Sequence, residues 1–449
     1  MFLEVEYGRV VPYKAARSQL EAHSVAAHFS NQSFDRTGVV VYDLKDNPNF
    51  VFGLKGEPAV WISKIKINNF KSLVDFEIDL AKFNCLIGLN GSGKSTILQA
   101  IDFLAQLIRG DLEGWLKKRR WRANELTSRL LDSNQIDFFV EFSQETAVEP
   151  LRWFGQYDVI KNYCIQERME LGDSSIEVID GELQWSDDAS ALNPGYYTDL
   201  KIFWKYQGSV LSSLISGSIF SAFMKKSGLA YYFRHTRSFD MLSPELLRRR
   251  TKEVTDSIGL GGETFSSYLS NLKSEKQSLL ANQLQEVYPR LAAVKTETLN
   301  SGRKQTTIEE VFGSKRFATE ARHVNDGFLR LAALLAMLES NQEFLLFDEI
   351  ENGINAELIE FLIKMLTQAK QQIIVTTHSP MILNFLEDNQ ARQGVIYLDK
   401  RADGTTRATS FFKIPSLDRK LSVMGAGEAF VDTDLLLLGD EIDRMAESG

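Results

Sequence analysis

The hydrophobic and polar positions along the chain change their period several times, and each period predicts one kind of element. From Trp61 to Leu80, apolar residues alternate with polar ones, as they do in half-buried strands. Residues 83–87 are apolar except for Asn84 and predict a buried strand. Beyond that strand, apolar side chains recur at helical spacing up to Ile108. This stretch therefore predicts strands that lead through a glycine-rich loop into a helix.

The rest of the chain repeats these patterns in a different order. Strand-like alternation returns between residues 138 and 185, whereas residues 269–287 carry leucines near a period of 3.6 up to Pro289. The last third alternates apolar strands at 344–347 and 373–376 with helical runs, which predicts an α/β fold with a mixed, largely parallel sheet. We expect four parts: a strand-rich N-terminal extension (1–60), an N-terminal lobe (61–189), an inserted helical lid (190–310) and a C-terminal lobe (311–449).

The composition is typical of a globular protein with more than one domain. The chain has 449 residues, of which 44% are hydrophobic, enough for one large core or two. It has no apolar run of about 18 residues, and its first residues lack the layout of a signal peptide. Two cysteines, Cys85 and Cys164, support neither a disulfide framework nor a cysteine zinc site. We therefore expect a cytoplasmic protein with no membrane partner.

The charge distribution leaves nucleic acid open as a partner. A formal net charge of -9 argues against a surface built wholly for nucleic acid, because such binding depends on clustered lysines and arginines. Two basic runs remain, at 117–122 and 248–252, and Trp121 in the first could stack on a base. Such runs are more often solvated faces, or contacts to the protein's own acidic surface. DNA binding therefore depends on these two runs alone.

Between the strand at 83–87 and the helix lies a complete phosphate-binding loop, Gly88-Leu89-Asn90-Gly91-Ser92-Gly93-Lys94-Ser95. Its backbone N–H groups and the following helix N-terminus suit a triphosphate, and its glycines allow an approach that a Cβ would block. We expect Lys94 to reach the β- and γ-phosphates and the Ser95 hydroxyl to ligate Mg²⁺. The residues of this loop expected to bind the nucleotide are Asn90, Gly91, Ser92, Gly93, Lys94, Ser95 and Thr96.

Two further segments supply the acids and the histidine that phosphoryl transfer needs. The strand at 344–347 ends in Asp348, expected to hold Mg²⁺, and Glu349, expected to polarise the attacking water. His378 follows the strand at 373–376, at the edge where ligands of open α/β sheets gather, and could sense the γ-phosphate. The structural alternatives are an acidic pair that solvates a strand end and an ordinary surface or core histidine. With the loop upstream, the pattern favours an ATPase that uses ATP and Mg²⁺.

These motifs, together with segment 322–330, resemble ABC-type ATPases of the SMC/RecF/OLD group, and in particular the compact "AAA family ATPase" branch without coiled-coil arms or a fused nuclease domain. Segments 67–73 and 349–355 also look like that group. The resemblance covers residues 61–100 and about 318–386 well, and the middle only in outline. It implies an ABC-type P-loop ATPase fold, in which the spacing of 348 − 94 = 254 residues accommodates the lid.

The resemblance also implies an assembly. In that family the signature segment of one subunit closes over ATP bound to the other, so that ATP is sandwiched in a head-to-tail dimer. Asn325, Asp326 and Gly327 match this segment, with Asn325 where the family usually carries serine. We therefore expect a homodimer, or a higher assembly built from dimers.

The expected role is an ATPase whose ATP-dependent dimerisation controls a separately encoded effector, a nuclease or toxin, in bacterial anti-phage defence. The chain shows no nuclease cluster, and the 449 − 378 = 71 residues after His378 are too few for a fused nuclease domain beside the end of the ATPase. Two alternatives stay open. One is a RecF-like DNA-binding repair or recombination ATPase, supported by the basic runs. The other is an ATP-bound scaffold with little turnover, supported by the departure at Asn325.

Overall fold

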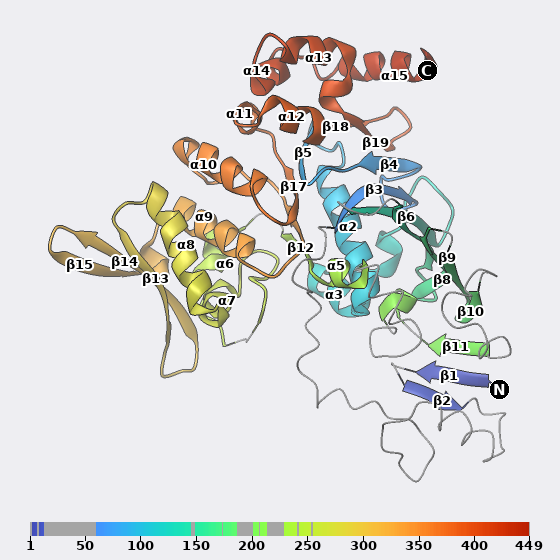
Figure 1. The fold of residues 1–449 in the computed structure, drawn as a ribbon, viewed down its shortest axis with the longest axis horizontal. Helices are drawn as coiled ribbons and strands as arrows, with labels where there is room; N and C mark the ends of the chain where they lie inside the picture. Colours follow the sequence, from blue (N-terminus) through green and yellow to red (C-terminus); the bar gives the residue numbers. More distant parts are fainter. Residues whose placement is uncertain are drawn as a thin grey trace. The chain divides into compact units, whose positions relative to one another are not determined.

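The computed structural model describes most of the chain from residue 60 onward (Figure 1). The expected strand-rich extension at 1–60 lies largely outside the described residues. The exceptions are two short strands, β1 (Phe2–Glu6) and β2 (Arg9–Pro12). The described residues are 2–6, 9–12, 60–144, 149–172, 174–185, 201–205, 207–212, 229–239, 242–252 and 255–448.

The chain divides into two compact units that interleave along the sequence. The first unit comprises residues 1–80, 99–234 and 400–407, and the second comprises 81–98, 235–399 and 408–449. Each unit therefore draws its residues from distant parts of the chain. No helix of the described residues is long and apolar enough to cross a membrane.

The first unit is built on a ten-stranded sheet in the order β2-β1-β11-β10-β9-β8-β7-β6-β3-β4. Its neighbouring strands are antiparallel except for the parallel pair β1 and β11. An antiparallel sheet can keep one face apolar and the other solvated. The remaining strands are β3 (Val60–Asn68), β4 (Phe76–Asp79), β6 (Gln135–Gln144), β7 (Leu151–Asp158), β8 (Tyr163–Leu171), β9 (Ser174–Ile179), β10 (Glu182–Trp185) and β11 (Lys201–Lys205).

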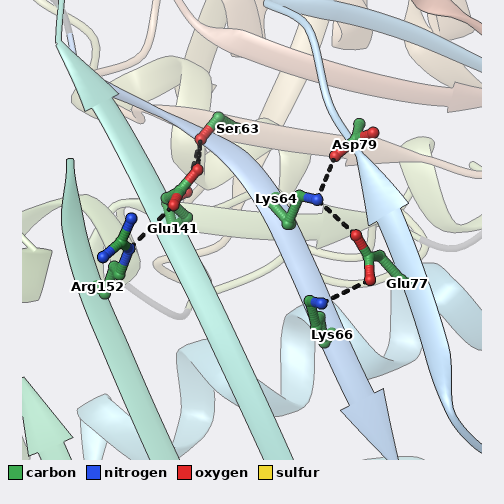
Figure 2. Close-up of polar contacts among 7 residues, drawn as sticks. All are labelled: Ser63, Lys64, Lys66, Glu77, Asp79, Glu141 and Arg152. Atoms are coloured by element: carbon green, nitrogen blue, oxygen red, sulfur yellow. Dashed lines mark hydrogen bonds and ion pairs between the residues drawn. The ribbon is translucent and has the colours of Figure 1, made fainter.

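Charged side chains pair across one region of this sheet (Figure 2). Lys64 and Lys66 of β3 contact Glu77 of β4 at 2.5 and 2.7 Å, and Arg152 of β7 contacts Glu141 of β6 at 3.1 Å. The hydrogen bond from Lys64 lowers the pKa of Glu77, and the same bond raises the pKa of Lys64. These side chains are partly exposed, and pairs of this kind contribute at most about 1 kcal/mol each.

One carboxyl group of the first unit is fully buried. Glu167 of β8 accepts hydrogen bonds from Trp153 Nε1 (2.9 Å), Ser209 Oγ (2.5 Å) and Val210 N (2.7 Å). Burial outweighs these three donors and raises the pKa of Glu167 to about 7. Short helical elements of this unit include α3 (Leu112–Arg119), η3 (Ala123–Glu125), η5 (Val210–Ser212) and α5 (Leu229–Arg234).

The second unit contains a six-stranded sheet in the order β12-β16-β17-β5-β18-β19 (Figure 1). The pairs from β12 to β18 are all parallel. Every residue of β5, β16 and β17 is buried, as a parallel sheet covered on both faces requires. The predicted α/β class with a largely parallel sheet is therefore confirmed. The strands are β5 (Phe83–Ile87), β12 (Thr236–Phe239), β16 (Phe344–Phe347), β17 (Gln372–Thr376), β18 (Val395–Lys400) and β19 (Thr406–Ser410).

Helices and a small antiparallel sheet complete the second unit. The three-stranded sheet has the order β13-β14-β15, with β13 (Leu291–Thr298), β14 (Lys304–Phe312) and β15 (Lys315–Glu320). Its helices include α9 (Asp326–Leu338), α10 (Ala356–Thr367) and α13 (Pro415–Leu421). The others are α6 (Pro244–Leu247), α7 (Phe265–Asn271), α8 (Ser274–Val287), α11 (Pro380–Asn384), α12 (Asp388–Gly394), α14 (Ala426–Val431) and α15 (Leu438–Ser448).

The segment 190–310, expected as a helical lid, contains both helices and strands in its described residues. It does contain the helices α7 and α8, but β12 belongs to the six-stranded sheet and β13 to the three-stranded one. The sequence of β12, Thr-Arg-Ser-Phe, has no apolar run although three of its four residues are buried, so its hydrophobic pattern does not predict a strand. The boundaries of the four expected parts stay a prediction.

Candidate nucleotide-binding site

The glycine-rich loop follows β5 and leads into α2 (Lys94–Arg109). Gly88 has φ +144°, and a Cβ there would collide with Leu398 O, so this position requires glycine. Gly91 and Gly93 also have positive φ, at +80° and +108°. The loop therefore has the backbone shape that lets phosphates approach the helix N-terminus.

Lys94 is buried within this loop. Its Nζ donates hydrogen bonds to Gly88 O (2.8 Å) and Leu89 O (3.1 Å). Burial lowers the pKa of Lys94, while the carboxylates of Asp348, Glu349 and Glu351 act in the opposite direction. The structure thus brings the acidic strand end, about 254 residues away in the sequence, into electrostatic range of the loop lysine.

The two predicted acids lie directly after β16 and are fixed by the neighbouring strand. Thr376, the last residue of β17, donates its hydroxyl to Asp348 Oδ1 (2.5 Å) and accepts from Glu349 N (2.8 Å). Glu349 has φ +48°, a left-handed conformation that is uncommon for a residue with a side chain. Asn352 contacts it twice, from N to Glu349 O (3.0 Å) and from Nδ2 to Glu349 Oε2 (3.1 Å). The backbone and the carboxylate of Glu349 are both held.

His378 follows β17 and lies beside the same acidic loop. Its backbone N–H donates to Glu351 Oε1 (2.9 Å), and the preceding Thr377 N donates to Leu86 O of β5 (3.1 Å). The phosphate loop, Asp348 and His378 therefore follow the carboxyl ends of three neighbouring parallel strands. Sequence reasoning missed Glu351, since nothing in its spacing indicates a bond to the His378 backbone.

The segment 325–327 forms the start of α9. Asn325 caps this helix, because its Oδ1 accepts from Phe328 N (2.8 Å), and both Asn325 and Asp326 are exposed. Gly327 is buried, and a Cβ there would lie 3.1 Å from Gly353 O. The three residues thus have separate local tasks within one chain, and their expected contact with a second chain stays a prediction.

Two arginines of the second basic run, at 248–252, bond to other residues of the second unit. Arg248 Nη2 donates to Val324 O (2.6 Å) and to Asp326 Oδ1 (2.5 Å), next to the start of α9. Arg250 pairs with Glu320 at 2.9 Å. Of this run, Arg249, Arg250 and Lys252 are exposed.

The first basic run, at 117–122, also contains both paired and exposed residues. The Arg119 side chain is 4% exposed and pairs with Asp102 at 2.7 Å. Lys71 Nζ lies 3.5 Å from the centroid of the Trp121 ring, and burial lowers the pKa of Lys71 to about 8. Trp121 is thus already covered on one side by the protein's own cation, which weakens its expected use as a base-stacking platform. The exposed basic residues of this run are Lys117, Lys118, Arg120 and Arg122.

The donor set fits a nucleotide-bound Mg²⁺ better than a metal held by protein alone. Ser95 and Asp348 offer a hydroxyl and a carboxylate, the hard oxygen ligands that Mg²⁺ prefers. Within the described ranges, no group of three or more His, Cys, Asp or Glu side chains could hold a metal ion. A Mg²⁺ at Asp348 would therefore take its other ligands from water and from phosphate oxygens.

Solved structures similar to this chain include SMC heads and RecF. The SMC head bound to the C-winged helix domain of ScpA is 14% identical, with a TM-score of 0.48, covering 78% of this chain and 97% of that one. The SMC head domain from Thermotoga maritima is 12% identical, with a TM-score of 0.40, covering 78% and 98%. The recombination mediator protein RecF-ATPrS of the RecFOR pathway is 14% identical, with a TM-score of 0.38, covering 78% and 99%.

Parts of the sequence are similar to ATPase domain families and to a known nuclease. An OLD nuclease of Thermus scotoductus (strain ATCC 700910 / SA-01) is 31% identical over 81 residues, and the match spans 18% of this chain and 14% of that relative. Residues 61–173 match the family model described as "AAA ATPase domain", and residues 187–384 match the one described as "AAA domain, putative AbiEii toxin, Type IV TA system". The two family matches and the short match to the OLD nuclease agree with the resemblance that the sequence predicts, to ATPases of the SMC/RecF/OLD group.

Proposed function

We propose that this protein binds ATP with Mg²⁺ and hydrolyses it to ADP and phosphate. One observation carries the proposal: a buried loop lysine, Lys94, lies in the field of Asp348 and Glu349 at the carboxyl ends of neighbouring parallel strands. A cation at a helix N-terminus opposite two acids suits a triphosphate and its metal. The match to an ATPase domain family supports the same reaction.

Each residue has a role in this proposal. The loop N–H groups from Asn90 to Thr96 and the Lys94 ammonium hold the phosphates, while Ser95 and Asp348 hold Mg²⁺, which neutralises charge on the phosphate oxygens. Glu349 orients the attacking water and takes up its proton, and His378 contacts the γ-phosphate. Thr376 keeps Asp348 and Glu349 in place through the two hydrogen bonds of its hydroxyl.

The proposal extends to assembly and biological role. Asn325, Asp326 and Gly327 of one subunit face the γ-phosphate held by another, so ATP assembles a head-to-tail dimer in the cytoplasm. The exposure of Asn325 and Asp326 supports this contact. The dimer controls a separately encoded nuclease or toxin in anti-phage defence, and the match of residues 187–384 to a family described with a toxin system supports that role.

The loop lysine tests nucleotide binding. Lys94→Ala should lower the affinity for ATP by about 100-fold or more, because the phosphates lose a charge-assisted hydrogen bond within a buried site. Isothermal titration calorimetry of the folded variant measures this loss. Parental affinity in the Lys94→Ala protein would remove the loop from the site.

Glu349 tests hydrolysis. Glu349→Gln should slow ATP turnover by about 10²–10⁴-fold while it leaves ATP affinity unchanged, because only water positioning and proton transfer are lost. The retained ATP should then hold the dimer closed, which light scattering with and without ATP and Mg²⁺ measures. Glu360→Gln, at an exposed position of α10, is the matched control. Parental turnover in Glu349→Gln would contradict the role of Glu349, and an inactive variant that stays monomeric would contradict the ATP-held dimer.

A further inference from the structure

Arg330 is a buried cation in the helix that carries segment 325–327. It lies in the second turn of α9, is 8% exposed, and donates from Nη1 to Asn352 O. Its Nε is buried and has no hydrogen-bond partner among the described residues. Gly353 packs against the guanidinium, since a Cβ on Gly353 would lie 2.6 Å from Nη1. A planar guanidinium thus fills the space between α9 and the loop after Glu349.

The surroundings of Arg330 are polar on the side of the acidic strand end. Arg330 lines a cavity of about 20 Å³ with Asp348, Glu349 and Asn352, and apolar residues close the rest of the lining. A volume of this size accommodates roughly one water molecule. Burial lowers the pKa of Arg330, whereas the carboxylates of Asp326 and Glu349 oppose that shift, and an arginine stays charged in either case.

A chain of hydrogen bonds leads from Arg330 to Glu349. Arg330 holds the carbonyl of Asn352, and Asn352 in turn holds Glu349 through its own N–H and through its side-chain amide. Glu349 needs such support, because its φ of +48° is disfavoured for any residue with a Cβ. The position of the Glu349 carboxylate therefore depends on contacts that originate in α9.

We propose that Arg330 is a positioning residue through which α9 sets the geometry of Glu349, so that hydrolysis responds to a contact made at the start of α9. The inference rests on the proposed ATPase function and names its regulation. Gly327 and Arg330 both contact the loop at 352–353, so a shift of the helix start is transmitted to Asn352 and from there to Glu349. In this proposal, the start of α9 contacts the nucleotide that is bound to a second copy of the chain.

The test is a kinetic comparison of Arg330→Lys, Arg330→Met and Asn352→Ala. Asn352 is exposed, and Asn352→Ala removes the bond from its Nδ2 to Glu349 Oε2 while it keeps the backbone groups that contact Arg330 and Glu349 O. Each variant should lower kcat for ATP by about 10–100-fold and leave KM and calorimetric ATP affinity within about twofold, because Glu349 is misplaced while the phosphate loop is intact. Arg330→Lys should retain little of the parental kcat, because a lysine side chain lacks the planar, forked guanidinium of arginine.

Two further measurements separate positioning from a merely structural role. In a Glu349→Gln background, adding Arg330→Met should lower single-turnover hydrolysis by less than about twofold, because the residue that it positions has already lost its function. Arg419→Met, at an exposed site in α13, is the matched control and should behave like the parent. Thermal unfolding of each variant establishes that it is folded.

The outcomes distinguish this inference from the proposed function. Parental kcat in both Asn352→Ala and Arg330→Met overturns the role of Arg330 while ATP hydrolysis itself stands. A full additional loss in the Glu349→Gln background, or a loss of ATP affinity, shows that Arg330 supports the unit in general and also overturns it. A parental protein that does not hydrolyse ATP, and matches its own Glu349→Gln variant, overturns the proposed function and the inference together.

Discussion

The two units each bury an arginine, and the partners of the two guanidinium groups differ. In the first unit, Arg119 pairs with Asp102, and both side chains are 4% exposed. The same carboxylate also accepts from Trp115 Nε1 (2.6 Å) and from Gln106 Nε2 (3.1 Å). Asp102 thus has donors on both of its oxygens, which identifies the cluster as a structural anchor.

Arg330 in the second unit has a different environment. It donates a hydrogen bond to a backbone carbonyl, and the carboxylates that line its cavity belong to Asp348 and Glu349. Those carboxylates follow the end of a strand of a parallel sheet and also oppose the lowering of the pKa of Lys94 by burial. Arg119 is paired with a carboxylate of its own, which favours a structural role. Arg330 lies beside carboxylates that belong to the candidate nucleotide site, which favours a role in that site.

Removing the carboxylate of the structural anchor should have the largest effect on stability. Asp102→Ala leaves the guanidinium of Arg119 and the indole N–H of Trp115 without their partner, so the free energy of unfolding should fall by about 3–5 kcal/mol. All six tryptophans lie in the first unit, so fluorescence-detected unfolding in urea reports on this unit. Asp132→Ala, at an exposed site, is the control. A fall below about 1 kcal/mol would contradict the anchor.

Glu167 sharpens the comparison, because it is a buried acid with three donors and no basic partner among them. Its pKa of about 7 in the folded unit lies above the ordinary 4.5, so between these values the folded state binds more protons than the unfolded state. The free energy of unfolding should therefore fall as the pH rises from about 4.5 to 7, by about 3 kcal/mol.

Glu167→Gln removes the charge and should flatten this part of the stability profile. Urea unfolding between pH 5 and 8, followed by tryptophan fluorescence, measures the slope. Glu113→Gln, on an exposed position of α3, should keep the parental slope. An unchanged slope in Glu167→Gln would assign the pH dependence to other groups.

The smallest effect on stability is expected for the exposed half of the first basic run. Changing its four exposed residues to glutamine should alter the free energy of unfolding by no more than about 0.5 kcal/mol. It should abolish a weak binding of duplex DNA that falls steeply as salt rises, which mobility shifts at two salt concentrations measure. DNA binding that survives the change would show that the run is a solvated face. The four residues are Lys117, Lys118, Arg120 and Arg122.

The buried strands of the parallel sheet could be predicted because their apolar residues are contiguous. Residues 83–87, 344–347 and 373–376 read as strands in the sequence and are β5, β16 and most of β17 in the structure. The edge strand β12 and the small sheet β13–β15 were missed, because their polar residues alternate irregularly and their pairing depends on distant segments.

The sequence predicts those residues of the site that belong to motifs of fixed spacing, but not the contacts between them. The loop with Lys94 and the acids after β16 have fixed spacing, and the structure places them within electrostatic range. The contacts of Glu351 and Arg330 connect side chains to backbone groups of other loops, which no periodicity reveals. The cap formed by Asn325 was readable, since asparagine before an apolar helical run is a common helix start.

The central place of β5 in its sheet affects how the protein is made. Phe83 of β5 pairs in register with Ile373 of β17, 373 − 83 = 290 residues later in the chain. At a synthesis rate of about 5–20 residues per second, the ribosome delivers that partner roughly 15–60 s after β5. The apolar strand that carries the phosphate loop therefore waits outside the ribosome without its neighbours, exposed to chaperones and to other nascent chains, until the last quarter of the protein emerges.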